Sequence, residues 1–114
     1  MNDYIKKARE FYLRGKLEYE EGLEEKDTVK VRKGCEEIFH SFVELSNGIL
    51  SEHGIQIPKN HKERAKGLDT FGLGITYDSV KERLHDTCYY NGIVDKTYLD
   101  ISIKIVDSEI KKRI

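Results

Sequence analysis

The stretch that decides the fold runs from residue 3 to residue 50 and reads DYIKKAREFYLRGKLEYEEGLEEKDTVKVRKGCEEIFHSFVELSNGIL. Apolar and small residues recur in its first half at three- and four-residue intervals, as in a helix that buries one stripe. They are Ile5, Ala8, Phe11, Tyr12, Gly15, Tyr19 and Leu23. The pattern predicts a first helix from Asp3 to about Glu25, with Asn2 or Asp3 as its N-cap.

A second stripe begins after a break at Asp27-Thr28 and stops at Gly54. It contains Cys35, Ile38, Phe39, Phe42, Leu45, Ser46, Ile49 and Leu50. Because the connection between these two long helices is short, we expect them to pack as antiparallel neighbours.

Shorter helices are predicted in the rest of the chain. Pro58 disfavours helix just before itself, and Asn60 with Glu63 has the spacing of a capping box that starts a helix reaching about Phe71. A further helix is expected from Asp78 or Ser79 to the stop at Asn91-Gly92.

The last helix is expected from about Lys96, capped by Asp95, to Arg113. Residues 101–105 alternate like a strand, but their flanks keep helical spacing, so we interpret them as helix. The chain is therefore predicted to be one all-α domain, residues 1–114, forming an antiparallel bundle of four to five helices.

Composition limits the classes of function. The 114 residues are 38% hydrophobic and 36% charged, with a net charge of −1, so the chain as a whole does not attract nucleic acid. No apolar run approaches the roughly 20 residues that span a bilayer, and we expect a cytoplasmic protein. The two cysteines, Cys35 and Cys88, fall on apolar positions and are expected to be reduced and structural.

The sharpest chemical pattern is a doubled Glu-x-x-His, at Glu37 to His40 and at Glu82 to His85. Di-iron sites in four-helix bundles use this motif twice. At 100° per residue, however, Glu37 and His40 lie more than a quarter turn away from the apolar face, whereas metal ligands must point into the bundle. We therefore predict no metal site and no cofactor.

A local basic cluster at residues 59–66 and a tyrosine pair are the other candidates. Lysine and arginine can grip RNA phosphates, and tyrosines can stack on bases, although such residues also serve as plain solvated surface. The candidate binding residues are Lys62, Arg64, Lys66, Arg83, His85, Tyr89 and Tyr90.

The order of these elements resembles that of HEPN-like helical proteins, especially the small archaeal PaREP-type group. The resemblance covers most of the chain and rests on residues 8–13 (AREFYL), 84–86 (LHD) and 89–92 (YYNG). It implies a dimeric up-and-down helical bundle. Some members of that superfamily are ribonucleases, and others are partners of nucleotidyltransferases.

The active members carry an Arg followed by a His after a spacer of about four to six residues near the start of a late helix. Here Arg83 and His85 have one residue between them, and Arg32 and His40 have seven. The motif is not intact, which favours a non-catalytic module that recognises RNA, a nucleotide or a partner protein. The alternatives are a divergent metal-independent ribonuclease, in which Arg83 and His85 from two subunits meet across a dimer axis, and a helical adaptor without a ligand.

The last helix has two apolar faces about 140° apart. One carries Tyr98, Ile101 and Ile105, and the other carries Leu99, Ile103, Val106 and Ile110. Only one face can serve the core, and an exposed apolar stripe usually marks an interaction surface. We expect a homodimer with its interface at Leu99, Ile103, Val106 and Ile110; the alternative is that the loop around residues 71–75 covers this stripe within one chain.

Overall fold

Small residues allow the first two helices to run in close contact. In the computed structural model, which describes residues 2–114, helix α1 spans Asp3–Glu25 and α2 spans Thr28–Glu52. Buried small residues line their contact at seven-residue spacing: Ala8, Gly15 and Gly22 on α1, and Gly34, Ser41 and Gly48 on α2. A Cβ atom on Gly34 would lie 2.6 Å from the backbone N of Tyr19, so the two backbones touch. The predicted antiparallel hairpin is confirmed.

A two-residue turn joins the two helices. Lys26 adopts the left-handed conformation (φ 57°), and its N–H donates to the carbonyls of Gly22 and Leu23 at the end of α1. The Asp27 side chain then accepts a hydrogen bond from the backbone N of Lys30 and caps α2. The turn thereby satisfies backbone groups at both helix ends.

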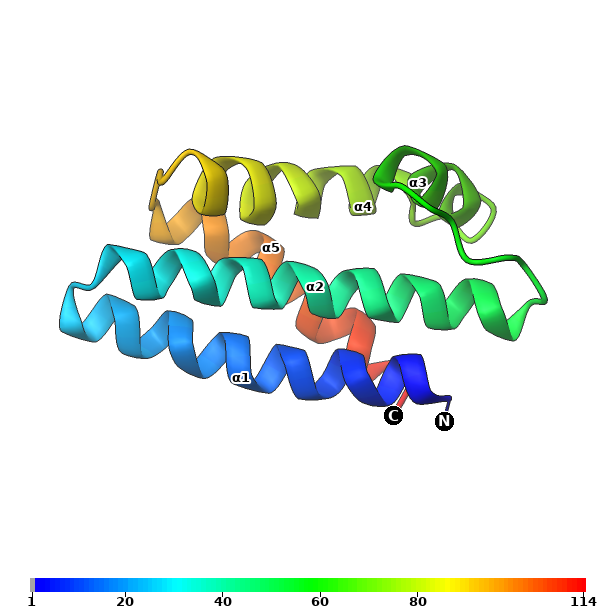
Figure 1. The fold of residues 1–114 in the computed structure, drawn as a ribbon, viewed down its shortest axis with the longest axis horizontal. Coiled ribbons are helices and arrows are strands. Elements are labelled where there is room, and N and C mark those ends of the chain that lie inside the picture. Colours follow the sequence, from blue (N-terminus) through cyan, green and yellow to red (C-terminus); the bar gives the residue numbers. More distant parts are fainter. Residues whose placement is uncertain (1) are drawn as a thin grey trace.

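The remaining helices fold back over this hairpin. Helix α3 spans His61–Asp69, α4 spans Gly74–Val80 and continues directly into a π-helix, η1, at Lys81–Tyr90, and α5 spans Lys96–Lys111. Figure 1 shows α2 between α1 on one side and the α4–η1 run on the other, while α5 passes behind α2 and ends near the N-terminus. The chain is all-α, as predicted. No helix of the described residues is long and apolar enough to cross a membrane.

The face of α5 that enters the core corrects one sequence prediction. Leu99, Ile103, Val106 and Ile110 are at most 3% exposed and belong to the hydrophobic core of the chain. They cannot form the exposed stripe that was expected at the dimer interface, because they pack against the chain's own helices. The face left toward solvent carries Ile101, which is 49% exposed.

Three of the predicted helix starts are confirmed by their caps. The side-chain oxygens of Asn2, Asn60 and Asp95 accept hydrogen bonds from the backbone N–H groups three residues later. The start predicted at Ser79 is wrong, since the helix is already under way from Gly74 and no side chain caps it. Helix α3 ends two residues before the predicted Phe71.

The two cysteines meet inside the bundle. Cys35 on α2 and Cys88 on η1 are fully buried free thiols that lie near each other. The neighbouring thiol and burial both raise the pKa of Cys35 far above its ordinary value. Cys35 is therefore held as a thiol at the contact between α2 and η1.

Candidate functional site

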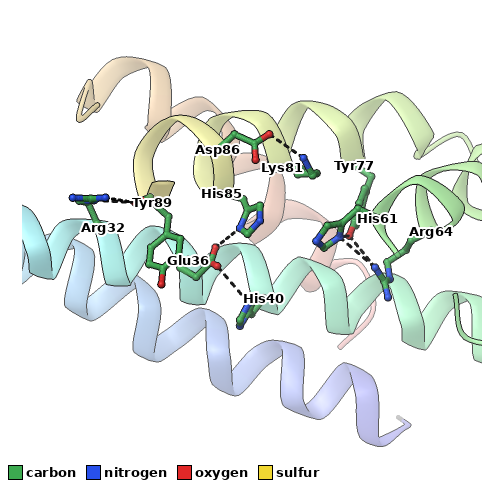
Figure 2. Close-up of polar contacts among 10 residues, drawn as sticks. All are labelled: Arg32, Glu36, His40, His61, Arg64, Tyr77, Lys81, His85, Asp86 and Tyr89. Atoms are coloured by element: carbon green, nitrogen blue, oxygen red, sulfur yellow. Dashed lines mark hydrogen bonds and ion pairs between the residues drawn. The ribbon is translucent and has the colours of Figure 1, made fainter. Parts of the chain in front are cut away.

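Two histidines from different helices lie side by side on one core ring. The ring of Phe39, on α2, is stacked against His85 of η1 with centroids 4.7 Å apart, and its centroid is 5.2 Å from that of His61 of α3. The two imidazole centroids are 5.6 Å apart, with one ring edge-on to the other. Figure 2 shows both rings in the space between α2 and the α4–η1 run.

A carboxylate of α2 orients His85. Glu36 Oε1 lies 2.7 Å from His85 Nδ1, while Oε2 lies 3.7 Å from Nε2 of His40, one turn further along α2 (Figure 2). The side chain of His85 is only 14% exposed and that of Glu36 only 16% exposed. A hydrogen bond from His85 to a largely buried carboxylate fixes the direction of the imidazole ring.

Tyr77 and Arg64 orient the ring of His61. Tyr77, on α4, places its hydroxyl 2.7 Å from His61 Nδ1, and Arg64 donates to the same hydroxyl at 3.3 Å. Burial, and then the positive charge of Arg64, lowers the pKa of His61. The neutral form of this imidazole is therefore favoured near pH 7.

Arg64 is a structural residue, which corrects its prediction as a contact to RNA phosphates. It is 7% exposed. Besides Tyr77, it donates to the side-chain oxygen of Asn47 at 2.8 Å and to the carbonyl of Pro58 at 3.0 Å. Its guanidinium ties α3 to α2 and to the segment before α3, and it does not reach the surface.

The π-helix places both tyrosines beside His85. In a π-helix the backbone hydrogen bonds run from i to i+5, one residue longer than in an α-helix, so residues four and five positions apart lie on the same side. The ring of Tyr90 meets His85 edge-on at 4.8 Å, and the ring of Tyr89 lies parallel to it at 6.3 Å. Tyr90 is 64% exposed. These three predicted binding residues therefore form one aromatic group with an open side.

Arg32 holds the end of this helix in place. Its guanidinium, from α2, donates to the carbonyl of Tyr89 at 2.7 and 2.9 Å and to that of Tyr90 at 3.1 Å. Figure 2 shows Arg32 reaching toward the end of η1. The last carbonyl groups of a helix have no partner within the helix. The side chain of Arg32 supplies donors to two of them and so caps the C-terminal end of η1.

Arg83 does not join His85 within the chain. It lies on the other side of η1, donates to the carbonyl of Tyr98 at 3.1 Å and stacks over the Tyr98 ring at 4.3 Å. His85 faces α2 instead. The two residues of the alternative catalytic pair thus diverge, and Arg83 is not part of the predicted binding face.

A cleft with lysines on its rim adjoins the histidines. It lies between α3 and α4 and has a volume of about 650 Å³. His61, Lys62, Lys66 and Lys81 line it, together with Asp69 and Asp78 and three apolar or small residues. Lys62 and Lys66 are exposed, and Lys81 forms an ion pair with Asp86 at 2.9 Å. The structure thus brings both predicted lysines to one rim.

The doubled Glu-x-x-His pattern does not assemble into one ligand set. Glu37 pairs with Arg14 of α1 at 3.2 Å, Glu82 is exposed, and His85 turns to Glu36 instead. Among residues 2–114, no group of three or more His, Cys, Asp or Glu side chains is arranged to hold a metal ion.

Sequence reasoning missed Glu36, Arg32 and the role of Phe39. Glu36 and His40 have the i, i+4 spacing of a helical pair, a signal that the more familiar Glu-x-x-His spacing obscured. Nothing in the sequence pairs Glu36 with His85, because that contact depends on how η1 packs against α2.

Comparison of this chain with known protein families, with curated proteins and with solved structures finds no match.

Proposed function

We propose that this protein is a HEPN-like binding module that holds single-stranded RNA or a nucleotide along the face formed by α3, α4 and η1. One observation carries the proposal: a continuous series of contacts runs from the exposed ring of Tyr90, through His85 and His61, to the lysine-lined cleft. An aromatic platform beside a basic groove is how proteins bind single strands, since bases stack on the rings and phosphates meet the cations.

Two lysines of the cleft are available to an anionic ligand, whereas Asp69 and Asp78 also line it and Lys81 is paired with Asp86. The net charge of the chain is −1, so a polyanion needs a local basic surface. Lys62 and Lys66 lie one helical turn apart on α3, and neither forms an ion pair within residues 2–114. Their ammonium groups are free to meet successive phosphates.

Fluorescence anisotropy with a labelled oligouridylate tests the proposal. We expect the Lys62→Ala/Lys66→Ala double variant to bind more weakly. We also expect its dependence of log K on log salt to be shallower by about 1.4, because each lost phosphate contact to a single strand removes about 0.7. The matched control is Lys6→Ala/Lys7→Ala, which removes two exposed lysines from α1. An equal loss in both double variants, or no binding by the wild type, would reject the proposal.

A tyrosine variant tests the aromatic end of the face separately. Stacking of a base on an aromatic ring contributes about 1–3 kcal/mol, so Tyr90→Ala is expected to weaken binding by at least about fivefold with little change in the salt dependence. Tyr4→Ala on α1 is the control.

The second candidate function is a metal-independent ribonuclease. The observation in its favour is His85, whose Nδ1 is hydrogen-bonded to Glu36 in the way that carboxylates support a histidine base. The ribonucleases that the chain resembles pair the histidine with an arginine, and here the nearby arginines are engaged: Arg32 with carbonyls, Arg64 in the core and Arg83 against α5. We therefore expect wild type and His85→Ala to leave single-stranded RNA equally intact. Cleavage that depends on His85 would reverse this ranking.

We still propose that the chain self-associates, but through the solvent-facing side of α5 and not through the buried one. The apolar face of α5 that is left toward solvent contains Ile101 and the half-buried Ile105 and Tyr98. Two-fold dimers are the commonest oligomers, and the HEPN-like resemblance implies one. We propose a homodimer that uses this face.

A further inference from the structure

The hydrogen bond of His85 to Glu36 decides which of its ring nitrogens carries the hydrogen. Its Nδ1 lies 2.7 Å from Glu36 Oε1, and a carboxylate can only accept, so Nδ1 carries the hydrogen. In the neutral imidazole, Nε2 is then a bare acceptor. In this neutral form His85 offers a lone pair at Nε2.

His61 has the opposite arrangement. Arg64 can only donate, and it lies 3.3 Å both from the Tyr77 hydroxyl oxygen and from His61 Nδ1. The tyrosine hydroxyl, having accepted from Arg64, donates its own hydrogen to Nδ1 at 2.7 Å. Nδ1 is therefore the acceptor, and Nε2 of His61 carries the hydrogen. Burial and the charge of Arg64 lower the pKa of this residue and favour that neutral form.

These hydrogen bonds thus leave an acceptor, Nε2, on the ring of His85 and a donor, Nε2, on the adjacent ring of His61. The rings are 5.6 Å apart, both rest on Phe39, and His61 also lines the lysine cleft. A ligand that matches them has a hydroxyl hydrogen adjacent to an anionic oxygen. A ribonucleotide has this pair, since its 2′-hydroxyl lies beside the 3′-phosphate, whereas a deoxyribonucleotide lacks the hydroxyl.

We propose that His85 accepts a hydrogen bond from a ribose 2′-hydroxyl while His61 donates to the neighbouring phosphate, so that this face selects RNA over DNA. The inference rests on the proposed RNA-binding function and adds its sugar specificity. On DNA, Nε2 of His85 would be covered without a partner, and a missing hydrogen bond of this kind corresponds to about five- to tenfold weaker binding.

The test compares three labelled oligonucleotides at pH 8: oligouridylate, its 2′-O-methyl form and its 2′-deoxy form. The 2′-O-methyl form keeps the oxygen but has no hydrogen to donate. We expect the wild type to bind the ribo form about five- to tenfold more tightly than either of the others, and anisotropy measures all three affinities on the folded wild type.

Two variants assign the preference to the histidine. His85→Phe keeps a ring on Phe39 but removes the acceptor and its cost when unpartnered, so it is expected to bind all three oligonucleotides with equal affinity. His53→Phe, whose ring packs on Phe71 at the far end of α2, is the matched control and should keep the preference.

The outcomes separate the two proposals. Equal binding of the three oligonucleotides by the wild type overturns the sugar specificity and leaves RNA binding in place. A preference that survives in His85→Phe also overturns it, because another group must then read the hydroxyl. Failure of the wild type to bind any of the three overturns both.

Discussion

The rings of His85 and Tyr90 meet edge-on, with their centroids 4.8 Å apart, although five positions separate them in one continuous helix. In an α-helix, residues five apart point about 140° away from each other. The π geometry of η1 brings them onto one side, and π-helical turns occur frequently at functional sites. The aromatic group of the candidate site thus depends on the π-helical geometry of η1, which is less common than that of an α-helix.

Arg32 is expected to stabilise that form. Arg32→Met keeps the aliphatic stem but removes every donor to the carbonyls of Tyr89 and Tyr90, and we expect a loss of about 1–3 kcal/mol in the free energy of unfolding. Urea denaturation measures it. Lys33→Met, at an exposed neighbouring position, should change stability by no more than about 0.5 kcal/mol. Equal effects of the two substitutions would show that Arg32 is not a cap.

The glycine contact between α1 and α2 gives a second prediction. A Cβ on Gly34 would lie 2.6 Å from the backbone N of Tyr19 and 2.9 Å from the carbonyl oxygen of Gly15, and neither backbone atom can move without separating the helices. We expect Gly34→Ala to lower the free energy of unfolding by about 1–3 kcal/mol.

Gly67→Ala is the matched control for Gly34→Ala. Its Cβ would meet only the flexible end of Leu50, at 3.3 Å. Because alanine favours helix over glycine by up to about 1 kcal/mol, this substitution should be neutral or stabilising. Thermal or urea unfolding of both variants decides, and a stable Gly34→Ala protein would contradict the close packing.

The helices could be predicted from the sequence where the evidence for them lies within a few neighbouring residues. The two stripes of residues 3–50 predict the hairpin, and Asn60 and Asp95 predict helix starts, because caps and apolar spacing act over a few residues. Ser79 failed although it has the same capping-box spacing. A capping side chain is needed only where the backbone N–H groups lack helical partners, and at Ser79 the helix that began at Gly74 already supplies them.

The site was predictable only in part. Lys62 and Lys66 line one cleft, and His85, Tyr89 and Tyr90 form one aromatic group, but Arg64 and Arg83 belong to neither, because each arginine is held by partners distant in sequence. Arg64 bonds Asn47, and Arg83 bonds the carbonyl of Tyr98. The sequence shows that a residue is basic. Where its side chain points depends on tertiary contacts, which the spacing of residues along the chain does not reveal.

The lowered pKa of His61 predicts how stability depends on pH. As the pH falls below about 6.5, the unfolded chain protonates this histidine while the folded chain does not. The unfolded state then binds more protons, so the free energy of unfolding decreases until the pH reaches the lowered folded pKa. One such proton contributes at most about 1.4 kcal/mol per pH unit.

His61→Gln removes this contribution and keeps a side chain that can accept from Tyr77. We therefore expect a smaller loss of stability between neutral pH and pH 5 in the variant than in the wild type, measured by urea unfolding at each pH. Parallel curves for the two proteins would show that His61 does not resist protonation.

The buried thiols should be inert in the folded protein. Both cysteines are fully buried, so a reagent cannot reach either sulfur in the folded chain, and the raised pKa of Cys35 also disfavours its own thiolate. We expect an aromatic disulfide reagent to modify native protein slowly at pH 8 and to modify both cysteines promptly in urea. Fast reaction of the native protein would place Cys35 or Cys88 nearer the surface than the fold allows.

The oligomer is tested by two isoleucines two positions apart on α5. Ile101 is 49% exposed, on the face that we propose as the dimer interface, whereas Ile103 is 3% exposed in the core. The same substitution should therefore act differently at the two positions.

Ile101→Glu is expected to leave the chain folded and to halve the mass found by light scattering, because it puts a charge into the interface alone. Ile103→Glu is expected to unfold the chain, since an unpaired charge would enter the core. Circular dichroism distinguishes the two results. A wild-type mass near 13.3 kDa at micromolar concentration would rule out the homodimer, and a doubled mass that persists in Ile101→Glu would move the interface to another face.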